Sequence, residues 1–169
     1  MTPKFSFARL AATSMLVLMP LAAPAFAAPI MVQSVEVDVA LADVTNTEAA
    51  TRFANLKPDL ENAIAARLVD RTDAEKGAKI KIDISELELS NGFTDVFNLA
   101  DTKLDGVVQI VGTPENPLTT RYELKVDVNT AKVYFPEGTD MATLPADSAI
   151  YYDAAIAAFA DNVVKKLDE

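Results

Sequence analysis

The chain has 169 residues, and its 25 acidic and 15 basic side chains give it a formal net charge of −10. It contains no cysteine and no histidine, which excludes disulfides, thiolate nucleophiles, zinc sites built from those residues and catalytic triads with an imidazole base. An acidic surface repels phosphate backbones and anionic lipid headgroups, so nucleic acid is not an expected partner.

The N-terminus has the pattern of a cleavable secretory signal. Lys4 and Arg9 lead into an apolar run over residues 10–21, and Ala25 and Ala27 are small residues at positions −3 and −1 of a cleavage site. The run is shorter than the roughly 20 residues that cross a bilayer as a helix, and Pro20 interrupts it. We therefore expect a signal peptide rather than a membrane anchor.

Cleavage would divide the chain into a signal at 1–27 and a single domain at 28–169. The signal carries two basic and no acidic residues, so the remaining chain has a net charge of −12. Its length is close to that of one domain, and no repeat or Gly/Ser-rich linker divides it. An exported lipoprotein would need a cysteine after the signal. The sequence therefore predicts a periplasmic or secreted protein with no transmembrane span after cleavage.

The first half of this domain alternates between a strand pattern and a helix pattern. Val35, Val37 and Val39 alternate with acidic residues, which is typical of a half-buried strand. A helix is expected from about Pro58, because Leu60, Ile64 and Leu68 follow at four-residue spacing. The stretch 47–56 is a further short helical candidate.

Three more strands and a long helix follow. Residues 79–90 alternate, but the apolar residues change phase after Ser85, which predicts a bulge or a change of packed surface. Residues 104–111 are apolar enough to suggest burial on both faces, and 121–128 alternate most regularly. The last helix is expected over 147–167, with Asp147 or Ser148 as N-cap. Its apolar stripe comprises Tyr152, Ile156, Phe159, Ala160, Val163 and Leu167.

The element order is therefore β-α-β-β-β-α. A long connection through the first helix allows the first two strands to be parallel neighbours, whereas the later strands are close enough for an antiparallel meander. Charged residues on the opposite strand faces indicate helices on one side only. The predicted fold is an α+β two-layer sandwich with a mixed, mostly antiparallel four-stranded sheet and helices on one face.

This arrangement resembles small bacterial envelope proteins of uncharacterised families. The resemblance rests on the short Val-rich strand at 35–39, the Ala-rich helix after it, and the long helix behind a meander. Auxiliary lipoproteins of outer-envelope transport systems have a broadly similar build, but they carry a lipidated cysteine that this chain lacks. The resemblance implies a binding or assembly role by analogy of fold and assigns no functional residue.

Acidic residues offer two candidate chemical sites. Asp101, Asp105 and Gly106 match three positions of a calcium-binding loop, but Lys103 and Gly112 occupy two ligand positions, so a capped turn before a strand is favoured.

Glu86 and Glu88, two residues apart on a strand, have a spacing compatible with an inverting glycosidase. A charged outer face of the sheet explains them better. We expect no enzyme activity, no metal and no cofactor, with a carboxylate-based hydrolase as the open alternative.

Two segments are apolar where a connection should be polar. The predicted interaction surface comprises Phe93, Val96, Phe97, Leu99, Tyr134, Phe135 and Met141. Both segments could instead fold down to close the ends of the sandwich, which is the favoured alternative. Two functions remain open, of which an exposed patch favours the first and an internal apolar cavity beneath the last helix favours the second. The first is a non-catalytic envelope protein that contacts another protein as an assembly or accessory module; the second is a binder of a small apolar or lipid-like ligand between sheet and helices.

Overall fold

The structure, a computed structural model, describes residues 29–39, 53–88, 103–114, 117, 119–144 and 148–169, with the backbone alone for 53 and 85–88. The elements within these ranges are four strands, three α-helices and three short 3₁₀ turns. The strands are β1 (Val32–Val39), β2 (Ala78–Glu88), β3 (Lys103–Val111) and β4 (Thr119–Asp127); the helices are α2 (Leu56–Arg67), α3 (Val128–Ala131) and α4 (Ala149–Lys166); the 3₁₀ turns are η2 (Phe53–Asn55), η3 (Val69–Arg71) and η5 (Lys132–Tyr134).

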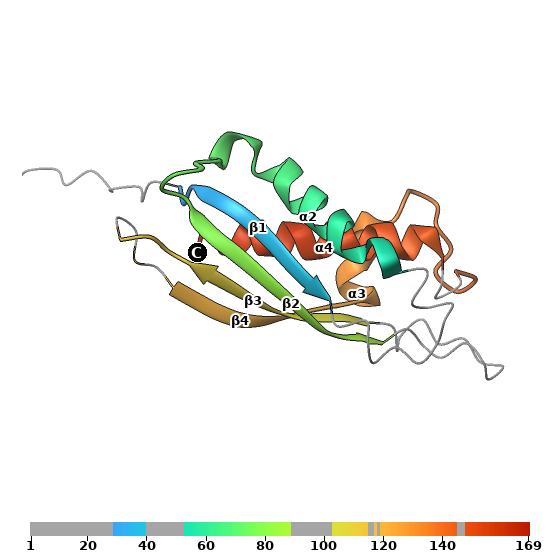
Figure 1. Cartoon of the computed structure of the whole chain (residues 1–169). Coiled ribbons are helices and arrows are strands. Elements are labelled where there is room, and N and C mark those ends of the chain that lie inside the picture. Colours follow the sequence, from blue (N-terminus) through green and yellow to red (C-terminus); the bar gives the residue numbers. More distant parts are fainter. Residues whose placement is uncertain (1–28, 40–52, 89–102, 115–116, 118, 145–147) are drawn as a thin grey trace, which may run out of the picture.

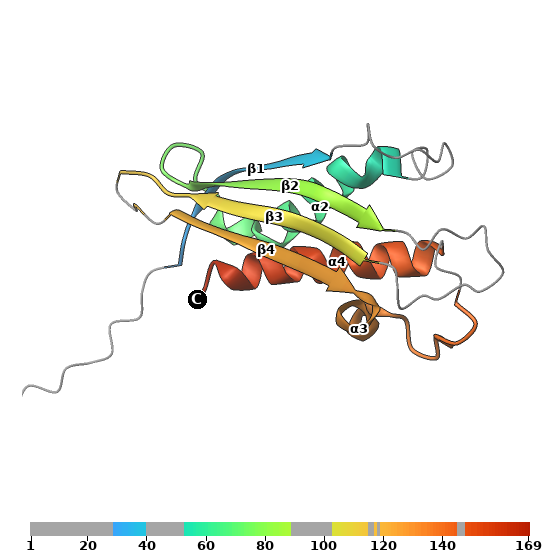
Figure 2. The same cartoon turned by 90° about the horizontal axis from the view of Figure 1, so that it is seen from below.

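The predicted α+β sandwich is confirmed. The strands lie in the order β1-β2-β3-β4, with β1 parallel to β2 and the other neighbours antiparallel. Helices α2 and α4 lie side by side over one face of the sheet (Figures 1 and 2). The sequence pattern did not predict the short helix α3, which follows β4 directly.

The phase change in the second strand is also confirmed. Ile80, Ile82 and Ile84 are all buried beneath the helices. The pairing of β2 with β3 then shifts register between Ile84 and Glu86. The extra residue at this point is the bulge that the change in hydrophobic phase predicted.

Two details of the later strands were predicted wrongly. Residue burial alternates along β3, so that Val108 and Ile110 are buried whereas Val107 and Val111 are only half-buried. The described helices cover only one face of the sheet, so the side chains on the other face stay partly exposed. Val128 does not extend β4 but begins α3, because Asp127 Oδ1 accepts a hydrogen bond from the backbone N–H of Thr130 at 2.9 Å.

The core lies between the sheet and the two long helices. Leu60 and Ile64 of α2 and Phe159 and Val163 of α4 are fully buried. Gly106 of β3 lies directly beneath α4: a Cβ atom built there would lie 3.4 Å from Phe159 Cζ and 2.9 Å from Ile84 Cδ1. The absence of a side chain at Gly106 therefore lets the Phe159 ring reach the backbone of the sheet.

The connection from α2 back into β2 wraps around the start of β1. Val32 forms an isolated parallel bridge with Thr72, and its carbonyl accepts a hydrogen bond from Asp73 N at 2.9 Å. Ala78 N then donates to Met31 O at 2.8 Å. Gly77 is pressed between these strands, and a Cβ atom there would lie 2.3 Å from Gln33 N. This turn brings β1 and β2 together as parallel neighbours.

Candidate functional site

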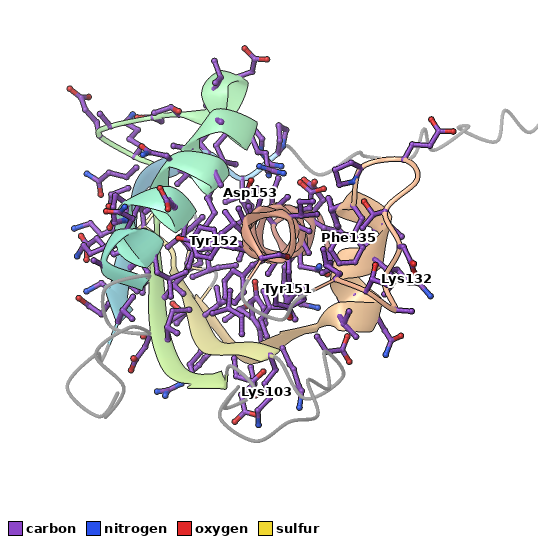
Figure 3. All side chains as sticks on the ribbon, turned by 90° about the vertical axis from the view of Figure 1, so that its right-hand side faces the viewer. Lys103, Lys132, Phe135, Tyr151, Tyr152 and Asp153 are labelled. Atoms are coloured by element: carbon purple, nitrogen blue, oxygen red, sulfur yellow. The ribbon has the colours of Figure 1, made fainter. Side chains whose placement is uncertain are left out.

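The segment that follows α3 carries the described part of the predicted interaction surface, and it contacts α4 at Asp161 and at Tyr151. Figure 3 views α4 end-on, with α2 on one side, the α3–η5 segment on the other and the sheet beneath. The Ser148 side chain caps the helix by accepting a hydrogen bond from Tyr151 N at 3.0 Å, as predicted. In the first turn, Tyr151 points toward the sheet, Tyr152 toward α2, and Asp153 away from the sheet (Figure 3).

Of the seven predicted surface residues, three are described, and they differ in exposure. Tyr134 is half-buried and donates a hydrogen bond from its hydroxyl to Asp161 Oδ2 at 2.7 Å. Phe135 is half-buried against Tyr151, with ring centroids 6.4 Å apart. Met141 is exposed. The two aromatic residues therefore anchor the segment after α3 onto α4, and Met141 remains available for contact.

The other four predicted residues lie outside the described part of the chain. They are Phe93, Val96, Phe97 and Leu99, all between β2 and β3. Their share in an interaction surface stays a prediction. The described ends of the flanking strands, Glu88 and Lys103, lie at the same end of the sheet as the start of α4 (Figures 1 and 2).

Large apolar side chains that remain exposed are concentrated in one stretch of the sequence. Across the described ranges, four such residues are found, and three of them fall between η5 and the first turn of α4: Val133 at 73%, Met141 at 37% and Ile150 at 39% exposure. The fourth, Val69, is 72% exposed and lies in η3, toward the opposite end of α2 (Figure 1). We call Val133, Met141 and Ile150 the apolar end surface.

Sequence reasoning found only one member of this surface. Ile150 was missed because it lies within the predicted last helix. Val133 was missed because it lies next to a connection that was expected to pack against the sandwich. A signal was present at Ile150: the residue lies off the stripe that runs from Ile156 to Leu167, so a helical register would have placed it outward. Val133 offered no comparable signal, since the 3₁₀ turn η5 was not expected.

A charged network holds η5, which contains Val133, to the two long helices. The Arg67 guanidinium of α2 donates to Asp161 Oδ1 of α4, and it also donates to Ala63 O at 2.9 Å. Asp161 therefore accepts hydrogen bonds from α2 and, through Tyr134, from η5. A single carboxylate thus joins three elements.

The titration of these groups reflects their contacts. Burial opposes ionisation of Asp161, but the hydrogen bonds from Tyr134 and Arg67 and the charge of Arg67 outweigh it, so the pKa of Asp161 lies below its ordinary value. Burial, together with the hydrogen bond to Asp161, raises the pKa of Tyr134 to about 12. Asp161 is therefore held as a carboxylate and Tyr134 as a neutral phenol at neutral pH.

A second tyrosine forms a similar link between the helices. The Tyr152 hydroxyl of α4 donates to Asp59 Oδ2 of α2 at 2.7 Å. Burial and this hydrogen bond raise the pKa of Tyr152. Tyr152 was predicted on the apolar stripe of α4, but it is only half-buried, and its neighbour Tyr151 is the buried residue. The helices thus meet through polar contacts along their outer edges as well as through the core.

Replacing Asp161 by asparagine tests whether this carboxylate stabilises the fold. We expect the variant to lose roughly 1 kcal/mol of unfolding free energy at pH 7, because the ion pair with Arg67 is partly exposed to solvent. A depressed pKa stabilises the folded state above the ordinary value of 3.8, and this contribution is lost as the pH falls below it. Urea denaturation at pH 7 and pH 3 should therefore show a difference at pH 7 that shrinks at pH 3. An equal difference at both values would contradict the assignment.

The remaining acidic candidates do not form a site in the described residues. Lys103 and Asp105 lie within β3 and not in a turn, with Lys103 Nζ 3.8 Å from Asp105 Oδ2, and Gly106 is covered by α4. Asp101 lies outside the described residues, so a capped turn before this strand stays a prediction. Glu86 and Glu88 belong to β2, and their side chains are not described. Within the described ranges, no group of three or more acidic side chains is arranged to hold a metal ion.

The solved structures to which this chain is similar include two weak likenesses. The chain is similar to a candidate lipoprotein from Caulobacter crescentus CB15, with a TM-score of 0.37 and 16% identity over 80% of this chain and 88% of that one. It is also similar to a Xanthomonas campestris protein of the DUF330 family, with a TM-score of 0.43 and 14% identity over 86% of this chain and 88% of that one. At these scores neither likeness bears on what this chain does.

No protein-family profile matches the chain, and no curated protein matches it by sequence. Among the described helices, none is both long enough and apolar enough to span a bilayer.

Proposed function

We propose that this chain is a non-catalytic accessory or assembly protein of the bacterial envelope that binds another protein through its apolar end surface. The observation that carries the proposal is the placing of Val133, Met141 and Ile150 between η5 and the first turn of α4. Exposed apolar side chains that cluster on an otherwise charged domain are typical of protein contact surfaces.

The anchoring of this segment supports a contact role. Tyr134 donates a hydrogen bond to Asp161 of α4, and the Phe135 ring packs against Tyr151 in the first turn of the same helix. A surface held in place before binding loses less conformational entropy when a partner arrives. The residues around Val133 therefore offer a preformed shape to the partner.

The packing beneath α4 favours a protein partner over a small apolar ligand inside the sandwich. Phe159 is fully buried and lies close to the backbone at Gly106. This ring occupies the space between α4 and the sheet at Gly106, where the ligand-binding alternative would place its ligand.

The state of Asp161 supports a structural role for this residue. A general acid at neutral pH needs a raised pKa, whereas the pKa of Asp161 is lowered. Its oxygens already accept hydrogen bonds from Arg67 and Tyr134, so the group acts in holding the fold together. The predicted export signal at 1–27 places the protein in the periplasm or outside the cell under this proposal.

Site-specific photo-crosslinking in intact cells tests the proposed contact. A photoreactive phenylalanine analogue placed at Val133, Met141 or Ile150 should trap the same protein from all three positions. Val69 is the matched control, because it is as exposed as Val133 but lies in η3, which follows α2. Crosslinks of equal strength from Val69, or none from the apolar end surface, would contradict the proposal. A small adduct seen by native mass spectrometry and lost on denaturation would favour the ligand-binding alternative.

A further inference from the structure

The two edges of the sheet differ in whether a further strand could pair with them. On β1, the backbone N–H of Val37 donates to Glu61 Oε1 of α2 at 3.0 Å, and Val32 is engaged by Thr72 and Asp73. The side chains of Glu36 and Asp38 on this strand are both negative. The edge at β1 is therefore partly closed by hydrogen bonds and repels a second acidic chain.

The edge at β4 has none of these features. It is the last strand of the sheet, and in the described ranges no strand or side chain binds its outer backbone between Thr119 and Lys125. An unpaired edge of this length is a template for pairing with another chain. The strand carries two positive and two negative side chains, so it is neutral within a chain of net charge −10. Two copies could therefore approach along β4 without net repulsion between the strands.

The order of charges along β4 is complementary to itself. Arg121, Glu123 and Lys125 alternate in sign on the exposed face of the sheet, and Asp127 continues the alternation, half-buried, while its Oδ1 caps α3. We propose that β4 of one copy pairs antiparallel with β4 of a second copy about a two-fold axis at Leu124. Arg121 then lies opposite Asp127 and Glu123 opposite Lys125, each pair occurring twice by symmetry. The two four-stranded sheets become one continuous sheet.

Neighbouring registers are less favourable. An axis at Glu123 would place Glu123 against its own copy and Arg121 against Lys125, and like charges directly opposite each other destabilise a strand pair. An axis at Tyr122 would keep the contact of Arg121 with Glu123 but place Asp127 opposite Pro117, which has no backbone N–H to donate. The register at Leu124 is the one that matches every charge on the strand.

The helix-side face of β4 also fits this pairing. Tyr122 and Leu124 are only half-buried in the single chain, although they pack against the core. With the axis at Leu124, the two leucines meet and Tyr122 lies opposite Val126 of the partner. Apolar surface at the uncovered edge is thereby removed from water, which favours association.

A charge exchange tests the proposed pairing. In sedimentation-velocity runs over a concentration series, the wild-type protein should dimerise, and Glu123→Lys should raise the dimer dissociation constant at least about tenfold, because residue 123 would face Lys125 twice. Glu123 is the preferred site because it pairs with Val107 within its own sheet, so the change leaves the monomer intact. The double variant Glu123→Lys/Lys125→Glu restores opposite charges and should restore dimerisation.

A matched control lies on the other edge. Asp38→Lys makes the same change of charge on β1, where the side chain is exposed, and should leave the dimer unaffected. A monomeric wild-type protein at all concentrations, a dimer insensitive to Glu123→Lys, or a double variant that is folded by circular dichroism and yet stays monomeric would each overturn the proposal; the fold is checked because Lys125 lies opposite Asp105 in its own sheet. Because β4 is separate from the apolar end surface, the outcome is independent of the crosslinking result.

Discussion

Replacing Gly77 by alanine is expected to lower the free energy of unfolding by about 3 kcal/mol or more, because overpacking against atoms that cannot move is costly. A Cβ atom at this position would lie 2.3 Å from Gln33 N, 2.4 Å from Val32 C and 2.6 Å from Asp73 O. All three neighbours are backbone atoms, and the backbones of Val32 and Asp73 are held together because Asp73 N donates a hydrogen bond to Val32 O. Relief would require β1 to separate from the turn before β2. Urea denaturation followed by circular dichroism measures the loss.

Gly138 is the matched control for this substitution. Nothing lies within 4 Å of a Cβ atom built there, but its φ of +83° lies in the left-handed region. Gly138→Ala should therefore cost only about 1 kcal/mol, through backbone strain alone. A loss at Gly77 no greater than the loss at Gly138 would contradict the close approach of the two strand connections.

Replacing Phe159 by alanine is expected to cost roughly 3 to 5 kcal/mol, as is typical when a buried aromatic ring is removed from a core. Phe159 is completely buried, and it contacts the sheet at the one position in β3 that lacks a side chain. The sheet could not fill the resulting cavity, because Gly106 beneath the ring has no side chain that could move into it. The measurement is the change in unfolding free energy from urea denaturation.

Ile150→Ala on the same helix is the control for this second prediction. Ile150 is exposed in the first turn of α4, so its truncation should change stability by no more than about 0.5 kcal/mol. If Phe159→Ala cost as little as the control, α4 would not pack on the sheet as described.

The sequence contained enough periodicity to predict the sheet, its mixed pairing and both long helices. Alternation in Val35–Val39 and in residues 79–84, and the four-residue spacing from Leu60 to Leu68, each reflect burial on one side of an element. The bulge after Ile84 was also predictable, because a change of hydrophobic phase has few other physical explanations.

What could not be predicted depended on local hydrogen bonds and on contacts between distant elements. Val128 continues the alternation of β4 in sequence. The structure nevertheless ends the strand at Asp127, because this residue caps the N-terminus of α3 by accepting a hydrogen bond from Thr130 N. The signal was an acidic residue three positions before a threonine, which competes poorly with a strong strand pattern. The link of Arg67 to Asp161 joins residues 94 positions apart, and neither has a sequence feature that identifies its partner.

The parallel pairing of β1 with β2 also sets an order in which the chain can assemble. β2, β3 and β4 follow one another as antiparallel neighbours, so each finds its partner soon after it is synthesised. β1 is made first, yet its strand partner begins at Ala78, after the whole of α2 and the turn at Gly77. Until that point its valines have no sheet to join and are open to wrong contacts. β1, the first strand to be made, therefore waits for a strand partner until β2 has been synthesised. Shielding its valines during that interval would reduce wrong contacts.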